Sequence, residues 1–227
     1  MTELMSTENK KSPQWRLPVL ALVMLSIPTH SAGPSAPWVG EALNGIACTG
    51  SKTRTFGPYD YATNKDKLPV VENRHFTPQV EQLARGETTG NAMGDVNYTL
   101  TMFPNHHRAL YSAVRYSLGE GPNSSKRDYY AECYLQRAIN FSPSDPVPHM
   151  LYGLYLHRLG NLEQSLEHYR TAESIAPTDP NLLYNYGLAL FDAGEYKASY
   201  EHARKAYDYG IQFPALKRKL QEIGHWK

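Results

Sequence analysis

Residues 174–179 read Ser-Ile-Ala-Pro-Thr-Asp, and residues 140–145 read Asn-Phe-Ser-Pro-Ser-Asp. In both stretches a proline closes an apolar segment, and an aspartate follows two residues later. The two prolines, Pro143 and Pro177, lie 34 residues apart. This period is typical of arrays in which each unit is a pair of helices. The sequence therefore predicts an all-α fold built from repeated helix hairpins.

Two complete copies of the unit, 146–179 and 180–213, carry the same residue at nearly all of the signature places. The first copy has Tyr152, Gly153, Leu156, Gly160, Ser165, Tyr169 and Ala172, and the second has Tyr186, Gly187, Leu190, Gly194, Ser199, Ala203 and Ala206. This pattern closely resembles the tetratricopeptide repeat (TPR) family. The resemblance implies that the small residues Gly153, Ser165 and Ala172 let two antiparallel helices approach closely, while large residues fill the gaps between them.

The segments on either side extend the array. Residues 77–145 are expected to form degenerate TPR-like helices, with Thr77 as the first N-cap and an insertion in the turn 119–126. Residues 214–227 are expected to form a C-terminal capping helix. Residues 37–76 have no sustained period and predict an irregular arm, with 68–71 as a short extended piece. The expected architecture is thus a TPR-type antiparallel helix-hairpin solenoid of about three repeats.

The amino terminus has the layout of a secretory signal. Basic residues within 10–16 precede the apolar run 17–27, and small and turn-forming residues follow. The run has 11 residues, whereas a membrane-spanning helix needs about 20. Residues 1–36 are therefore expected to be a cleaved signal peptide. An uncleaved signal anchor is the alternative, because Pro34 and Pro37 crowd the candidate cleavage bonds.

Export predicts a periplasmic protein, or an inner-membrane protein facing the periplasm if the anchor is retained. Three segments, 57–61, 75–78 and 103–108, are similar to exported proteobacterial TPR-containing proteins, a resemblance that implies no activity. The chain has two cysteines, Cys48 and Cys133. An even count in an exported chain predicts one disulfide between them. Two buried thiols or an unpaired reactive thiol are the alternatives.

Composition excludes some classes of partner. The 23 basic and 22 acidic side chains nearly cancel, giving a net charge of +1. Such a balance provides no global field to attract nucleic acid or an anionic membrane surface. Tyrosine is frequent, with 17 residues, and its apolar body and polar tip suit interfaces. We expect no nucleic-acid partner, and contact with a membrane only through an uncleaved amino terminus.

Histidines offer the main alternative to a binding protein. His75, His106 and His107 suggest a metal site, since imidazole is a common ligand. However, adjacent histidines on a helix point about 100° apart, and paired helical ligands are usually four residues apart. No phosphate-binding loop or nucleophile elbow occurs. We therefore expect no catalytic residue, no metal and no cofactor.

The TPR resemblance also implies a concave groove lined by the first helix of each repeat. Residues at groove-facing places mix aromatic, arginine and aliphatic side chains, which is typical of interfaces. Asn185 matches one residue of a carboxylate-clamp groove, but the other clamp places differ, so capture of a C-terminal tail is not expected. The predicted protein-binding residues are Arg108, Tyr111, Arg115, Met150, Leu154, His157, Asn181, Tyr184, Leu188 and Phe191.

Three hypotheses of function follow from the sequence. The leading one is an exported adaptor or scaffold that binds a peptide or partner protein in the groove, within an envelope or secretion assembly. The second is a structural subunit that assembles with copies of itself into a homo-oligomer. The third is a metal-dependent enzyme that uses the region of His75, His106 and His107.

Overall fold

The structure, a computed structural model, describes residues 35–50, 56–88, 90–121 and 129–226. The predicted signal segment 1–36 falls almost wholly outside these residues, so the export prediction rests on sequence alone. The sequence also predicts a helix over 127–141, closed by Pro143, and the beginning of that range lies outside the described residues. Within the described part of the chain, no helix combines the length and the apolar character needed to span a bilayer.

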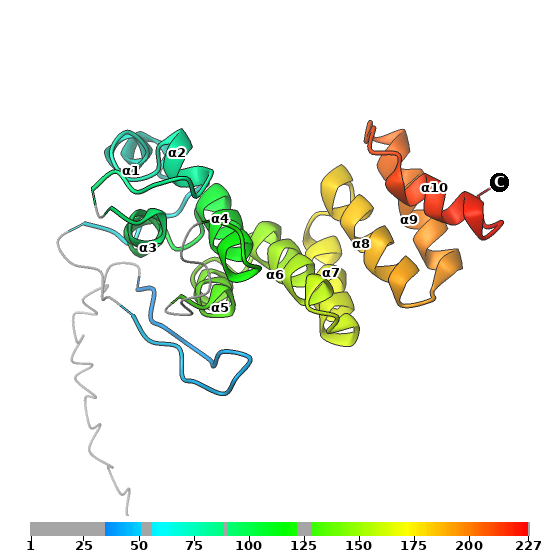
Figure 1. Ribbon diagram of the computed structural model, residues 1–227, viewed down its shortest axis with the longest axis horizontal. Coiled ribbons are helices and arrows are strands. Elements are labelled where there is room, and N and C mark those ends of the chain that lie inside the picture. The colour runs from blue at the N-terminus through cyan, green and yellow to red at the C-terminus, as the bar shows by residue number, and fades with distance from the viewer. Residues whose placement is uncertain (1–34, 51–55, 89, 122–128, 227) are drawn as a thin grey trace, which may run out of the picture. The chain divides into compact units, whose positions relative to one another are not determined.

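The two complete repeats form antiparallel helix pairs (Figure 1). The first pair is α6 (Pro146–Arg158) with α7 (Leu162–Ile175), and the second is α8 (Pro180–Asp192) with α9 (Tyr196–Asp208). Each pair starts with the same device, in which an aspartate caps the helix and a proline occupies the first turn. The repeated Asp-Pro signals in the sequence therefore set the helix boundaries.

The turn inside each hairpin depends on glycine. Gly160 ends the first helix of one repeat and Gly194 ends that of the next, with φ of 81° and 80°. A left-handed residue at this place closes the helix and reverses the chain, and glycine adopts it without a steric penalty. The same turn geometry in both copies keeps the two hairpins alike.

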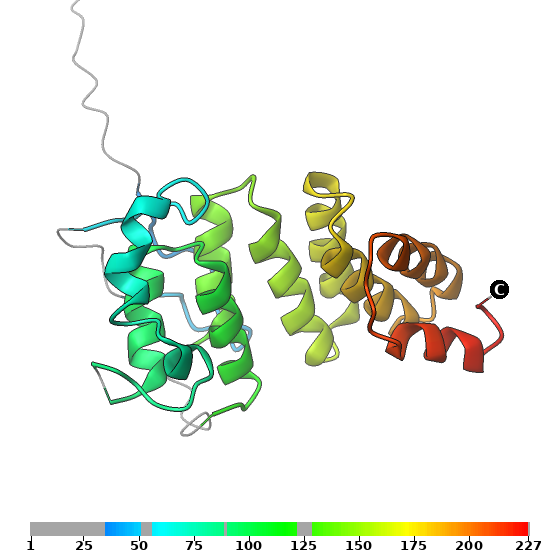
Figure 2. The ribbon, with the colours of Figure 1, turned by 90° about the horizontal axis from the view of Figure 1, so that it is seen from above.

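The degenerate repeats continue the stack toward the amino terminus. They comprise α2 (Pro78–Glu81), α3 (Ala92–Met102), α4 (His107–Ser117) and α5 (Ala131–Phe141). At the other end, α10 (Ala215–Glu222) packs against α8 and α9. In the view of Figure 2 the helices follow one another in chain order, from cyan to red. The predicted all-α solenoid of helix hairpins is confirmed.

The structure corrects one detail of the predicted arm and one of the helix that follows it. Residues 68–71 are not extended: α1 (Leu68–Glu72) follows a short 3-10 helix, η1 (Lys65–Lys67), because Pro69 sits in its first turn, where proline is tolerated. The glycine at position 86 predicts the end of the helix that starts after Thr77, but α2 ends earlier, at Glu81. Leu83 adopts φ of 59° and is 1% exposed, so burial of its side chain holds a conformation that interrupts the helix.

An amide inside the structure joins three parts of the chain. Asn105 is buried, and its amide nitrogen donates to Asp60 at 3.0 Å and to Asp145 at 3.1 Å. Its side-chain oxygen accepts from the backbone nitrogen of Tyr61 at 2.9 Å. Segments 57–61 and 103–108, singled out from the sequence, therefore meet at one polar centre, which also includes Asp145, the N-cap of α6.

The amino-terminal arm lies along α5. Arg137 donates to the carbonyl oxygen of Ala36 at 2.8 Å and to that of Leu100 at 2.7 Å, and its guanidinium lies 4.8 Å from the Trp38 ring. Burial lowers the pKa of Arg137 to about 10. Further along the arm, Cys48 and Cys133 form the disulfide that the cysteine count predicts. Hydrogen bonds and a covalent bond thus fix the arm to the solenoid.

Candidate functional site

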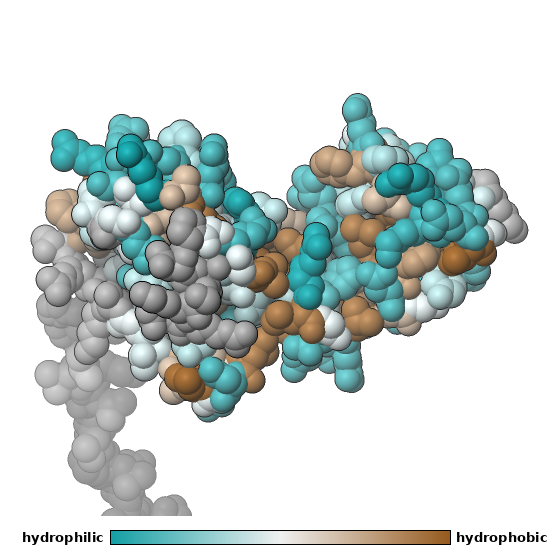
Figure 3. Space-filling model, in the orientation of Figure 1, coloured by the Kyte–Doolittle hydropathy of each residue, from teal (hydrophilic) through white to brown (hydrophobic). Residues whose placement is uncertain are grey.

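The first helices of three successive hairpins, α4, α6 and α8, line a groove of about 720 Å³. Helix α4 contacts α6, and α6 contacts α8. Figure 3 shows hydrophobic residues gathered over α6, in the middle of the face it presents. The groove is lined by His107, Arg108, Tyr111, Val114, Arg115, Leu118, Glu120, Val147, Met150, Leu151, Leu154, Arg158, Asn181 and Asn185.

The spacing of these residues explains why they meet. On α6, Val147, Met150 and Leu154 recur every three or four residues, which places them on one face of the helix. On α4, Arg108, Tyr111 and Arg115 follow the same rule. The opposite face of each helix faces its hairpin partner, so the sequence period itself directs these side chains into the groove.

Tyr111 is the exposed aromatic side chain of the groove. It is 46% exposed although it lies on a packed helix. The guanidinium of Arg115 lies 5.8 Å from the centre of its ring, within the range of a cation–π contact. Tyrosine and arginine are two of the residue types that are enriched at the energetic centre of protein interfaces.

Carboxylates hold the arginines of α4 in place. Arg108 forms ion pairs with Glu81 and with Glu72, the latter at 3.4 Å, and Arg115 pairs with Glu120 at 2.7 Å. The hydrogen bond from Arg108 lowers the pKa of the Glu81 carboxyl. Both guanidinium groups are therefore positioned before any partner binds, which reduces the side-chain entropy lost on binding.

The groove also has polar residues on α6 and α8. Arg158, the last residue of α6, forms no ion pair with any residue in the described ranges, whereas Arg108 and Arg115 do. On α8, the Asn185 amide donates to the Asn181 carbonyl oxygen at 2.8 Å. These residues offer hydrogen-bond donors and a cation to a partner.

Six of the ten predicted groove residues line the observed groove: Arg108, Tyr111, Arg115, Met150, Leu154 and Asn181. It places the other four elsewhere. His157 bonds to Asp192 at 2.8 Å, and Leu188 and Phe191 pack against the cluster that contains Leu216 and Leu220 of α10.

Tyr184 requires the clearest correction. It is 8% exposed and lies in the same cluster as Leu216 and Leu220, with the Phe213 ring at 5.6 Å. Its predicted place as an exposed side chain of the groove is wrong, because α10 covers this part of α8. The repeat pattern gives the face on which a residue lies, but it does not say what covers that face.

The histidines of the metal hypothesis separate into different pairs. His75 bonds to Asp95 at 2.9 Å, His106 to Glu72 at 3.1 Å and His107 to Asp145 at 2.7 Å. In the described ranges, no three His, Cys, Asp or Glu side chains are grouped to hold a metal ion. Each histidine instead joins neighbouring segments through one carboxylate.

His106 has a structural role that the sequence did not reveal. Its Nδ1 accepts a hydrogen bond from the Ala109 backbone nitrogen at 3.2 Å, so the ring caps α4. Its Nε2 must then carry the proton given to Glu72. The ring is fully buried beside Tyr61 and Phe76, and burial lowers its pKa to about 3. A neutral capping histidine follows from this geometry.

Comparison with protein-family models now identifies the repeat. Residues 153–194 match the TPR repeat. The match runs from the middle of α6 through α7 and α8, and this TPR-type hairpin is the unit on which the groove is built. Since TPR arrays are typically scaffolds for protein–protein interaction, the match supports a protein partner. A search among curated proteins gives no match.

Proposed function

We propose that this chain is an exported adaptor that binds an extended segment of a partner protein in the groove of α4, α6 and α8. The observation that carries the proposal is the exposed Tyr111 between two positioned arginines, opposite the apolar residues Met150 and Leu154. Apolar and aromatic surface provides the main binding energy in such grooves. The TPR match supports the same class of function.

The charges of the groove define the partner segment further. Arg108, Arg115 and Arg158 line it together with one carboxylate, that of Glu120. An acidic side chain of the partner can therefore pair with Arg158, while apolar side chains lie against α6. Complementary charge increases the association rate and selects among partners more than it adds affinity. The proposed ligand is thus an apolar segment that carries a carboxylate.

The Cys48–Cys133 disulfide supports the export part of the proposal. Disulfides persist in oxidising compartments such as the bacterial periplasm and are rare in the cytosol. The signal-like segment 1–36 agrees with that location, with cleavage or retention of the segment deciding between a periplasmic and a membrane-anchored form. Intact mass of the protein purified from its native host distinguishes the two, because a cleaved chain starts between Ala32 and Trp38.

Site-specific photo-crosslinking tests the groove. A photoreactive phenylalanine analogue replaces Tyr111 in one variant and Tyr209, which is 52% exposed on the last turn beyond α9, in a matched control. We expect the analogue at position 111 to form a crosslink with a partner protein, and we expect this crosslink to disappear when Arg158→Glu is added to the same variant. Equal crosslinking from Tyr209, or crosslinks only between copies of this chain, contradicts the adaptor and favours the self-assembling subunit.

A further inference from the structure

A second cavity lies between the amino-terminal arm and the solenoid, away from the groove. It has a volume of about 210 Å³. Four tyrosines, Tyr116, Tyr129, Tyr130 and Tyr155, line it together with the carboxylate of Glu132. The exposed side chains of Leu43 and Leu159 form its rim. Nothing in the repeat pattern requires so many tyrosines around one acidic group.

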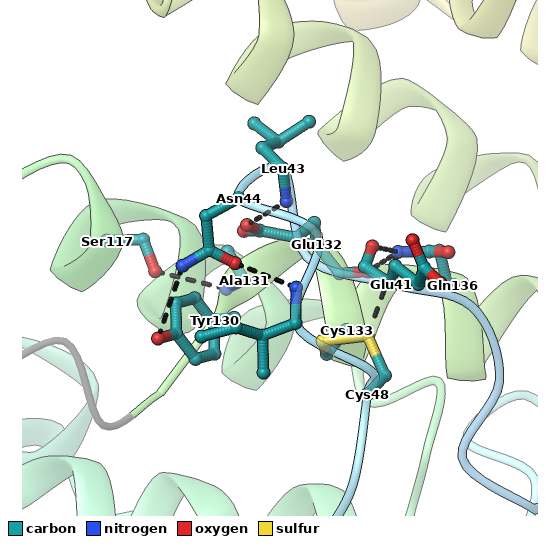
Figure 4. The surroundings of a disulfide bond; sticks show 11 residues. Glu41, Leu43, Asn44, Cys48, Ser117, Tyr130, Ala131, Glu132, Cys133 and Gln136 are labelled. Atoms are coloured by element: carbon teal, nitrogen blue, oxygen red, sulfur yellow. Dashed lines mark hydrogen bonds between the residues drawn. A yellow bond between two sulfur atoms is a disulfide. The ribbon is translucent and has the colours of Figure 1, made fainter.

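Glu132 is an unusual residue to find in this wall. It is 3% exposed and lies in the first turn of α5. One carboxylate oxygen accepts from the Leu43 backbone nitrogen at 3.0 Å, and Figure 4 shows this bond reaching up to the arm. The other oxygen, Oε2, is buried and has no hydrogen-bond partner among the described residues. A buried carboxylate with an unused oxygen carries a substantial free-energy cost unless a donor or cation approaches it.

Among the described residues of the cavity wall, no cation meets this need. None of those that line it is Lys, Arg or His, and no ion pair between described residues involves Glu132. The rings around it are themselves suited to a cation, because the face of an aromatic ring carries negative electrostatic potential. Tyr116 and Tyr129 meet edge to face, with ring centres 6.3 Å apart. The aromatic rings and the Glu132 carboxylate therefore both attract a positively charged group.

The size of the cavity limits what can occupy it. Its volume is several times the roughly 30 Å³ that one water molecule occupies in the liquid. It is smaller than the roughly 300–1,000 Å³ of pockets that take whole drug-sized ligands. The occupant is thus a compact group, of the size of one amino-acid side chain.

We propose that this cavity binds an organic cation, an ammonium group held against the tyrosine rings with Glu132 as its counter-ion. The group comes either from a small alkylammonium ligand or from a lysine side chain of a bound protein. Aromatic cages of this kind recognise ammonium ions, because the negative face of each ring attracts the positive charge. The site is separate from the groove and does not depend on the groove's proposed function.

The arm completes the site. Leu43 and Asn44 belong to the arm, and the Asn44 amide lies 3.5 Å from the Tyr130 hydroxyl. Gln136 donates to the Glu41 carbonyl oxygen at 2.8 Å, and the disulfide joins Cys48 to α5 one residue after Glu132. These bonds hold one wall of the cavity against the other. Cation binding is therefore expected to require the oxidised chain.

Titration of the oxidised full-length chain with tetramethylammonium tests the site, with the tyrosine ring signals followed by NMR. A neutral compound of similar size, 2-methylpropan-2-ol, is the matched ligand control. A capped peptide with a central lysine distinguishes a side-chain source from a free ligand. We expect saturable shifts of the cavity tyrosines with at least one of the two cations and none with the alcohol. Equal shifts with the alcohol, or none with either cation, overturn the proposal.

Variants separate the carboxylate from the rings. Glu132→Gln keeps an acceptor for the Leu43 nitrogen and removes the charge, so the dissociation constant should rise about tenfold or more. Tyr129→Leu, at a half-buried position, should weaken binding several-fold, whereas Tyr111→Leu in the groove should leave it unchanged. Circular dichroism of each variant verifies folding. If folded Glu132→Gln binds the cation with unchanged affinity, the assignment of Glu132 as counter-ion is wrong and the proposed site is overturned.

Discussion

The hydroxyl of Ser165 donates a hydrogen bond of 2.7 Å to the carbonyl oxygen of Gly153, and Ser199 repeats the bond to Gly187 at 2.8 Å. All four residues are at matching places of the two repeats. A serine can reach the carbonyl of the facing helix because the glycine has no side chain between them. The small residues of the TPR pattern therefore both permit the close approach and supply a bond across it.

The two glycines differ in what a larger side chain would meet. A Cβ at Gly153 would lie 3.0–3.1 Å from ring atoms of Tyr169, which is fully buried, whereas one at Gly187 would meet the terminal methyl of Leu216 at 2.8 Å. Both Tyr169 and Leu216 are fully buried, but the clash at Gly153 is relieved only if a whole ring moves, whereas the terminal methyl of a leucine can shift by a side-chain rotation. Gly153→Ala should thus lower the free energy of unfolding by about 1–3 kcal/mol.

Gly187→Ala is the matched control in urea unfolding. Alanine has a helix propensity about 1 kcal/mol better than glycine, so this variant should be neutral or more stable. Equal losses in the two variants would show that the Tyr169 ring yields as readily as the Leu216 methyl, and that rigid packing against Tyr169 is not what requires glycine at position 153.

Tyr184 and Tyr111 occupy corresponding places in their repeats but should respond oppositely to truncation. Tyr184 is 8% exposed and Tyr111 is 46% exposed. Tyr184→Ala removes a ring from the cluster under α10 and should lower the free energy of unfolding by about 3–5 kcal/mol, as large-to-small core substitutions do. Tyr111→Ala should change it by less than about 0.5 kcal/mol.

Urea unfolding of both variants tests this assignment. A measurement of partner binding tests the opposite expectation, that Tyr111 matters for binding and not for stability. Tyr111→Ala should weaken binding by about 1–3 kcal/mol if the proposed function holds. A stable Tyr184→Ala variant would mean that α10 does not cover α8 in solution. The groove would then extend along α8, as the sequence alone predicted.

The contrast shows how far the sequence alone reaches. The 34-residue period fixed α6 to α9, because each boundary has its own local signal, an Asp-Pro start and a glycine turn. Position in the repeat also defines a face of each helix, and Tyr111 and Met150, which it assigns to the groove-facing side, line the groove. It failed for Tyr184, because coverage by α10 depends on a packing that no local pattern records.

The cavity under the arm was not predictable in the same way. The arm has no period, and its course depends on long-range bonds such as that from Arg137 to Ala36 and the disulfide. Cys48 and Cys133 gave the one usable signal, since an even count predicts that the arm is tied to the helices. Which side chains of α5 then face the arm follows only from the folded chain.

One buried and one half-buried histidine should make the protein sensitive to acid. Burial lowers the pKa of His106 to about 3 and that of His168 to about 4, whereas an unfolded histidine titrates near 6.5. Below about pH 6.5 the unfolded chain therefore binds protons that the folded chain does not. The free energy of unfolding should be highest above pH 6.5 and fall toward pH 4, by up to about 1.4 kcal/mol per pH unit for each histidine.

His106→Asn isolates one of these contributions. Asparagine can accept the bond from the Ala109 nitrogen as a helix cap, but it does not titrate. The variant should be less stable at pH 7.5, because the buried ring is lost, and its stability should depend less on pH between 6.5 and 4. Urea unfolding at a series of pH values measures the slope. A slope as steep as that of the wild type would mean that His106 titrates normally in the folded protein.

The disulfide should stabilise the amino-terminal part of the array selectively. Cys48 and Cys133 are 85 residues apart, and closing a loop of this length stabilises by roughly 3–5 kcal/mol in the chain-entropy model. Repeats contact only their neighbours, so replacing both cysteines by serine should speed hydrogen exchange in residues 36–48 and α5 and leave α8 and α9 unchanged. A variant in which only Cys48 is replaced also lacks the disulfide but keeps the thiol of Cys133, and so controls for the hydroxyl that serine introduces at position 133. Exchange that rises equally in α8 and α9 would show that the arm supports the whole array. Non-reducing peptide mapping that finds both thiols free in protein purified from its native host would contradict the disulfide.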